Sequence, residues 1–237
     1  MTHADAALAV GFVGLTVAMF PADRSIARRL VNENSKANQF FNTSSTGFEV
    51  ITVPGAYIVG PAIYAFGHFA HHPAIADLGW HGTEAVFLAT GVTGVLKGVL
   101  GRARPYVTND TNPREFKFGK GFVGEDHASF PSGHTTVAFA AASSVTSELQ
   151  HVWPGHTWLA APVLYGGATL VGLSRMYHNK HWASDVALGA AVGTFVGLKT
   201  VRYAHLHPDN RLDRWLLSTT IAPDRHGGAI LAWSIAQ

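Results

Sequence analysis

Two long stretches without charged side chains constrain the fold of this chain most strongly. Neither Asp, Glu, Lys nor Arg occurs from Val50 to Ala76 or from Leu149 to Ser174. Each stretch is long enough to cross a bilayer as a helix, which needs about 20 mostly apolar residues. Charged residues form only 14% of the 237 residues, against about 25% in a typical soluble domain. Because the mean hydropathy of +0.14 is low for a multi-span protein, composition favours a membrane protein without deciding the class.

The apolar residues gather into six segments, at about 6–20, 50–69, 83–100, 135–149, 157–174 and 183–198. These segments are longer than ordinary strands, which hold about 3–10 residues, so they predict helices. We therefore expect an all-α fold, a membrane-spanning bundle of about six helices. Small residues recur in the last two segments, "LYGGATLVGL" and "ALGAAVGTFVG", which permits close helix packing.

Three further segments connect or follow these helices. Residues 23–48 carry several cations and predict an amphipathic surface helix followed by a loop. Residues 101–130 are rich in Asn, Asp, Gly and Pro and predict a long loop of the kind that often has a function. The polar tail 201–237 ends in "GGAILAWSIAQ", which indicates a short strand after a glycine turn.

Lys97 and Arg104 form the first of three charged clusters, in "KGVLGRARP". Their spacing of seven residues is nearly two helical turns, so both cations can lie on one helix face. Pro105 disfavours helical geometry at Arg104 and places its guanidinium near the helix end. Taken alone, the pair is better explained by cations that extend from an apolar helix to the membrane interface.

The second cluster is "PSGH", Pro131 to His134, which directly precedes a run of small apolar residues. Ser132 can cap a helix, and Gly133 lets a ligand approach the backbone closely. The exposed N–H groups at a helix start favour anions. A plain capped helix with a surface histidine explains this cluster equally well.

The third cluster is "SRMYHNKHWASD", Ser174 to Asp185. Arg175 ends one apolar segment, and His181 and Asp185 open the next. A His and an Asp four residues apart share one helix face, so the carboxylate can accept a hydrogen bond from Nδ1–H. Nε2 then keeps a free lone pair, as a nucleophile or base requires. A surface His–Asp pair is the simpler alternative.

The three clusters lie at the same end of the bundle if the six helices alternate in direction. Three cations with helix-start amides then form a site for a small, multiply charged oxyanion, and phosphate fits best. Two histidines beside it suit in-line displacement at phosphorus, in which one attacks and the other protonates the leaving oxygen.

Together the clusters resemble the three-part signature of the type 2 phosphatidic acid phosphatase superfamily. That superfamily contains membrane lipid phosphatases, soluble bacterial acid phosphatases and vanadium haloperoxidases. The resemblance covers residues 97–185 and implies a single phosphatase domain over residues 1–237, with 201–237 as its tail. The matching positions are Lys97, Arg104, Pro105, Pro131, Ser132, Gly133, His134, Ser174, Arg175, His181 and Asp185.

The resemblance implies a metal-independent hydrolysis of a phosphomonoester or diphosphate, with no cofactor. His181 would attack phosphorus and form a phosphohistidine while Asp185 orients its ring. His134 would act first as general acid and then as general base. The phosphate oxygens would be bound by Lys97, Arg104, Ser132, Gly133 and Arg175.

The charge-free segments favour a phosphorylated lipid as the substrate: phosphatidic acid, phosphatidylglycerol phosphate, an isoprenyl diphosphate or a lipid A phosphate. A soluble periplasmic acid phosphatase is the main alternative. A vanadium haloperoxidase fits less well because members of that branch are longer chains, and a phosphate-binding membrane protein without activity needs no oriented His–Asp pair. Nothing in the sequence indicates nucleic-acid binding or an oligomeric state.

The resemblance places the chain in a bacterial inner membrane as a multi-pass protein, with its site facing the periplasm. A count of the flanking cations instead places the site on the cytoplasmic side, and we prefer the resemblance. A weaker cluster, His68, His71 and His72 in "HFAHH", has the spacing of metal ligands on a helix but only Asp77 as a nearby carboxylate. Interfacial histidines explain it better than zinc does.

Overall fold

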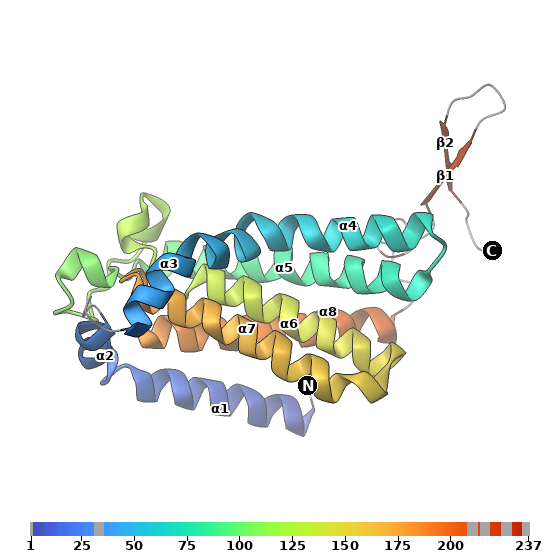
Figure 1. Ribbon diagram of the computed structural model, residues 1–237. Coiled ribbons are helices and arrows are strands. Elements are labelled where there is room, and N and C mark those ends of the chain that lie inside the picture. Colours follow the sequence, from blue (N-terminus) through green and yellow to red (C-terminus); the bar gives the residue numbers. More distant parts are fainter. Residues whose placement is uncertain (1, 31–35, 208–212, 214–218, 224–228, 234–237) are drawn as a thin grey trace.

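The computed structural model describes residues 2–30, 36–207, 213, 219–223 and 229–233. Within these residues the fold is helical apart from one pair of strands (Figure 1). Six of the helices lie side by side as a bundle: α1 (His3–Met19), α4 (Ala56–Phe69), α5 (Pro73–Leu100), α6 (Gly133–Val152), α7 (Thr157–Tyr177) and α8 (Ala183–Leu206). The expected all-α bundle is confirmed, and each of the six apolar segments corresponds to one of these helices.

Helix α5 begins ten residues earlier than the apolar segment 83–100 predicts, at Pro73. Proline is favoured at the first position of a helix because its missing N–H has no intrahelical partner there. The first turns of α5 contain Asp77, His81 and Glu84. These polar residues interrupt the apolar pattern, so the pattern does not indicate where the helix begins.

The prediction of a surface helix followed by a loop at residues 23–48 is wrong about the loop. This connection holds two helices, α2 (Asp23–Leu30) and α3 (Lys36–Val50), and α3 continues through a short π-helical turn (Ile51–Gly55) into α4. Phe41 of α3 is buried and stacks on Tyr177 of α7 with ring centroids 4.5 Å apart. Packing against α7 therefore stabilises a helix whose polar sequence does not predict one.

The centre of the bundle is α6, which packs against α5, α7 and α8. Its approach to α8 is close because glycines of α8 face it. A Cβ atom added to Gly193 would lie 2.3 Å from the carbonyl oxygen of Thr136. Gly172 of α7 is also closely packed, since a Cβ atom added there would lie 2.8 Å from Val186 of α8. The close packing expected from the small residues of the last two segments is thus present, although Gly166 and Gly167 of α7 have no neighbour within 4 Å.

Four segments of the described chain are helical, long and apolar enough to cross a membrane: Gly47–Phe69, Pro73–Leu100, Pro154–Tyr177 and Ala183–Leu206. Helices α1 and α2 form a further candidate, bent by 68° between them. The chain is therefore a multi-pass membrane protein. Helix α6 stands apart from this set: it lies at the centre of the bundle and carries buried Ser, Thr and Glu side chains.

The C-terminal tail contains two antiparallel strands, β1 (Thr219–Pro223) and β2 (Ala229–Trp233). They form a hairpin that stands away from the bundle in Figure 1. The strand expected within "GGAILAWSIAQ" is confirmed as β2.

The glycine contact between α6 and α8 gives a stability prediction. We expect Gly193→Ala to lower the stability of the detergent-solubilised protein by about 1–3 kcal/mol, because the new methyl group would overlap the α6 backbone. Gly166→Ala is the matched control and should be neutral or stabilising, since it adds a better helix former where space is open. Thermal unfolding of both variants tests this, and equal transition temperatures would contradict the close packing.

Candidate active site

A pocket of about 420 Å³ opens at the end of the bundle where α5 ends and α6 and α8 begin. Its walls bring together residues from all three charged clusters. Ser132 and Asp185 are fully buried beside it. The pocket is lined by Glu49, Val53, Lys97, Arg104, Glu125, Gly133, His134, Arg175, Lys180 and His181.

Lys97 and Arg104 reach the pocket by a different route from the one their spacing predicts. Helix α5 ends at Leu100, Gly101 follows with φ 59°, and Arg104 has extended backbone geometry. The expectation that both cations lie on one helix face is therefore wrong. They meet because the 101–132 loop folds back: Lys97 Nζ donates to the carbonyl of Ala128, and Arg104 Nε donates to that of Glu125 at 2.8 Å.

The "PSGH" cluster forms the start of α6. Ser132 is the N-cap residue, but its hydroxyl accepts a hydrogen bond from the Thr135 hydroxyl at 2.8 Å instead of capping the helix. Its backbone N–H donates to the carbonyl of Asp185 at 2.9 Å, which joins the starts of α6 and α8. Gly133 and His134 line the pocket, at a helix end whose first amides have no intrahelical partner.

His181 lies two residues before α8, so it does not share a helix face with Asp185 as the spacing predicts. Asp185 is in the first turn of α8, and one carboxylate oxygen lies 3.5 Å from Nδ1 of His181. That same oxygen accepts hydrogen bonds from the Ser129 hydroxyl at 2.5 Å and from the Trp182 N–H at 2.8 Å. The carboxylate is thus fixed behind the imidazole, leaving Nε2 as the ring nitrogen without a carboxylate beside it.

Both histidines are held in the neutral form at neutral pH. Burial lowers the pKa of His134 to about 4, and the nearby Arg175 cation adds to this effect while Glu49 opposes it. Burial also lowers the pKa of His181 well below its usual value, although the Asp185 carboxylate opposes the shift. A neutral imidazole keeps a lone pair available for attack or proton transfer.

Arg102 is a residue of this end of the bundle whose role the sequence does not reveal. Its side chain is fully buried and lies between two buried carboxylates. Nη1 donates to Asp185 at 2.5 Å, and Nη2 donates to Asp23 at 2.7 Å. Asp23 also accepts from the N–H and the hydroxyl of Ser184, at 2.8 and 2.6 Å. This network joins α2, the 101–132 loop and α8 behind the pocket.

Four aromatic rings surround the Arg102 guanidinium. The nearest is Phe20, whose centroid is 4.7 Å from the guanidinium carbon. The other three centroids lie 5.3–5.6 Å away, those of Phe116, Phe130 and Trp182. Arginine suits such a place because its planar cation stacks on rings while it forms several hydrogen bonds.

Glu49 is a second pocket residue that the sequence does not indicate. It belongs to α3 and lies just after the connection expected at residues 23–48. Its carboxylate forms an ion pair with Nη1 of Arg175. Glu49 and Arg175 are 126 positions apart, so their contact depends on the packing of α3 against α7. The positive charge of the pocket is therefore partly neutralised.

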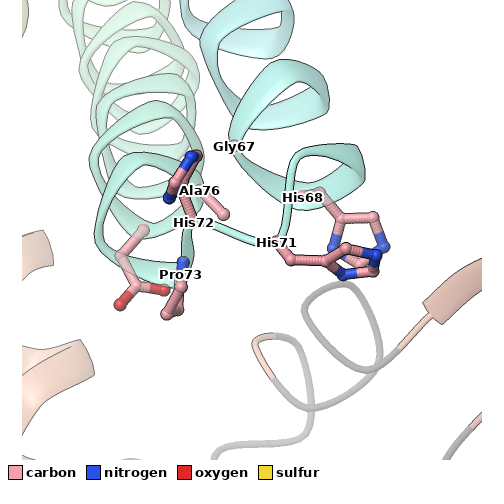
Figure 2. Close-up of a pocket in the computed structure, with 7 residues that line it drawn as sticks. Gly67, His68, His71, His72, Pro73 and Ala76 are labelled. Carbon is pink, nitrogen blue, oxygen red and sulfur yellow. The ribbon is translucent and has the colours of Figure 1, made fainter.

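The histidines of "HFAHH", which have the spacing of metal ligands, lie at the other end of α5. They line a pocket at the turn between α4 and α5, together with Asp77. Figure 2 shows the rings of His68 and His71 on one side of this turn and that of His72 on the other. His68 stacks on Tyr64 with ring centroids 5.5 Å apart. The three rings do not converge on a common point.

The sequence matches a known family over the region that forms this pocket. A model of the PAP2 superfamily matches residues 79–208, which include the whole signature. The chain belongs to the PAP2 superfamily. The resemblance drawn from the three clusters is therefore confirmed.

Two relatives and one solved structure resemble this PAP2 chain. A "Lipid A 1-phosphatase" of Porphyromonas gingivalis is 45% identical over 69 residues, 29% of this chain and 15% of the relative. A "Probable lipid phosphate phosphatase beta" of Arabidopsis thaliana is 28% identical over 130 residues, 46% of this chain and 58% of the relative. The chain thus spans less than two thirds of the length of either relative.

The fold resembles that of a "transmembrane PAP2 type phosphatidylglycerolphosphate phosphatase from Bacillus subtilis". The alignment covers 89% of this chain and 99% of that one, with a TM-score of 0.58 and 21% identity. The shared feature is the helical architecture. It agrees with the membrane-spanning bundle described above.

The buried Arg102 network gives a second prediction. We expect Arg102→Leu to lower the free energy of unfolding by about 3–5 kcal/mol, because it leaves two buried carboxylates without their cation. Lys117→Leu removes an ion pair to Glu115 in which the lysine side chain is 52% exposed, and it should cost at most about 1 kcal/mol. Thermal unfolding in detergent compares the two; an Arg102→Leu protein as stable as the Lys117→Leu protein would contradict the role of the network.

Proposed function

We propose that this PAP2 protein is a lipid phosphatase that hydrolyses a phosphomonoester or diphosphate through a phosphohistidine. One observation carries the proposal: three cations surround two neutral histidines in one pocket, and one histidine has a buried carboxylate behind it. A site that only binds phosphate needs the cations, but it does not need an imidazole oriented by a buried carboxylate. The names of the relatives, both of them lipid phosphatases, support the same reading.

In the first step Nε2 of His181 attacks phosphorus, so that an N–P bond forms as the bond to the leaving oxygen breaks. Asp185 stabilises the positive charge that develops on the imidazole. His134 takes up the proton that a monoanionic substrate phosphate brings into the pocket and donates it to the leaving alkoxide or phosphate. In the second step neutral His134 takes a proton from water, which attacks phosphorus and releases inorganic phosphate and neutral His181.

The cations Lys97, Arg104 and Arg175 would bind the phosphate oxygens, together with the amides at the start of α6. Loop carbonyls hold Lys97 and Arg104, and the Glu49 carboxylate holds Arg175. Little reorganisation would therefore accompany charge development in the transition state. The cations and the amides supply the charge stabilisation that a magnesium clamp supplies in other phosphoryl-transfer enzymes. We therefore expect the reaction to proceed without added metal.

Exposed apolar groups at this end of the bundle support a lipid substrate. Val53 lines the pocket and is exposed on the α3–α4 side. On the 101–132 loop Phe118, Phe122 and Val123 are each at least 67% exposed. Exposed aromatic and apolar side chains at one end of a membrane bundle are typical of the interface with lipid headgroups. The phosphate would enter the pocket while the acyl or isoprenyl chains stay in the bilayer.

We place the protein in a bacterial inner membrane with the pocket facing the periplasm. The family resemblance supports this orientation, against the count of flanking cations. Because the chain has no cysteine, a single Phe118→Cys variant can be labelled in intact cells with a maleimide that does not cross membranes. Rapid labelling before lysis is expected, and labelling that appears only after lysis would reverse the orientation.

Phosphate release from a panel of substrates tests the activity. The panel contains an aryl phosphate, phosphatidic acid, phosphatidylglycerol phosphate, an isoprenyl diphosphate and a lipid A phosphate, each with and without EDTA. We expect turnover of one lipid that resists EDTA and falls by at least about a thousandfold in His181→Ala, because the nucleophile is lost. Turnover of the aryl phosphate alone would indicate a general acid phosphatase, and release from none would contradict the proposal.

His134→Ala separates the two histidine roles. With a nitrophenyl phosphate, whose leaving group needs no proton, the variant should still release one equivalent of nitrophenol rapidly and then stall as the phosphohistidine. With an alkyl phosphate the first step itself should be slow. Equal losses with both substrates would contradict the assignment of His134 as general acid.

The histidine pKa values also predict an acidic optimum. Free His134 is neutral above about pH 4, so the proton for the leaving group enters with the substrate, whose phosphate binds as a monoanion below about pH 6. We expect kcat/KM to peak near pH 5 and to fall about tenfold for each pH unit above about 6. Initial rates from pH 4 to 9 test this, and a flat profile from pH 5 to 9 would contradict it.

A further inference from the structure

A second cluster of polar side chains lies at the end of the bundle opposite the pocket. It joins three core helices, because His81 comes from α5, Glu148 from α6 and His205 from α8. Glu148 is fully buried and His81 is 4% exposed. One Glu148 oxygen contacts Nδ1 of His81, and the other lies 3.0 Å from Nε2 of His205. The three potential ligand atoms are within 4.8 Å of one another.

We propose that His81, Glu148 and His205, together called the distal triad, bind a divalent transition-metal ion, with zinc the best fit. Two imidazole nitrogens and one carboxylate are a donor set that zinc uses in proteins, with a fourth position for water. Imidazole ligands also favour zinc and its transition-metal neighbours over calcium and magnesium, which prefer sites made only of oxygen.

The surroundings of His81 support ligation through Nδ1. Its other nitrogen, Nε2, is buried and lies 3.5 Å from a carboxylate oxygen of Asp213. Among the described residues it forms no hydrogen bond. Asp213 is itself held by Trp80, whose Nε1 donates to it at 2.8 Å. Metal-binding histidines commonly direct their second nitrogen at such a carboxylate, which fixes the ring and its tautomer. The distal triad thus has the outer support that metal sites show.

An ion could reach the distal triad from the surface. The His205 side chain is 33% exposed, and its ring stacks on His151 with centroids 4.1 Å apart. A bound cation would link α5, α6 and α8 at the end where no signature residue lies. It would also compensate the buried Glu148 carboxylate, which is costly in an apolar bundle. Its role would be structural, and it is independent of the reaction proposed for the pocket.

Metal content of the full-length protein tests the proposal. The protein is purified in detergent with its affinity tag removed, incubated with zinc, and dialysed against metal-free buffer before elemental analysis. We expect about one zinc ion per chain in the wild type and less than about a tenth in His205→Ala. His68→Ala is the matched control, because it removes a histidine at the same end but outside the distal triad, and it should keep the ion.

Cobalt provides a test that does not depend on a variant that folds. Cobalt bound by two imidazoles and a carboxylate should give visible d–d absorption in the wild type and in His68→Ala but not in His205→Ala or Glu148→Gln. A chelator should lower the transition temperature of the wild type and of His68→Ala, but not that of His205→Ala or Glu148→Gln. Wild-type protein without retained zinc and without the cobalt absorption would overturn the proposal, as would equal zinc in the wild type and His205→Ala.

Discussion

The fixed position of Asp185 is the constraint on which this end of the molecule depends. A carboxylate can orient an imidazole only if it cannot turn away, and Asp185 is held by Arg102, Ser129 and the Trp182 N–H. Arg102 in turn is bound by Asp23, by the Ser184 hydroxyl and by the Pro113 carbonyl, which accept hydrogen bonds from its guanidinium. The bend between α1 and α2 brings Asp23 to this place. Helix α2, which lies outside the signature, therefore helps to hold the signature residue Asp185 in place.

The sequence was sufficient to predict the six long helices, because the apolar segments are long enough. It also predicted that the three clusters lie at one end of the bundle, because the helices alternate in direction. The predictions failed where the spacing of two residues was taken to mean that they share one helix. Lys97 and Arg104 do not share a helix, since Gly101 ends α5. His181 and Asp185 do not either, because α8 begins between them. The residues still meet, since the 101–132 loop and the α7–α8 turn return to the same end.

What the sequence could not reveal depends on contacts between residues far apart along the chain. Helix α3 is polar and is stabilised by the packing of Phe41 on Tyr177, so no local pattern indicates it. Asp23 and Arg102 are separated by 79 positions and look like ordinary surface charges until the fold buries both. Glu148 resembles a polar residue near a helix end, yet it is fully buried against two histidines from other helices.

The pocket end of the bundle combines signature residues with residues outside the signature, and this difference bears on substrate choice. Every signature residue that lines the pocket is a cation, a histidine or a glycine. In the function we propose, these residues would recognise the phosphate and no other part of the substrate. The groups that a lipid backbone would meet lie outside the signature: Glu49 and Val53 at the α3–α4 junction, and the exposed apolar residues of the 101–132 loop. On this proposal two chains with the same signature could act on different lipids, because selectivity would reside in a surface that the signature does not specify.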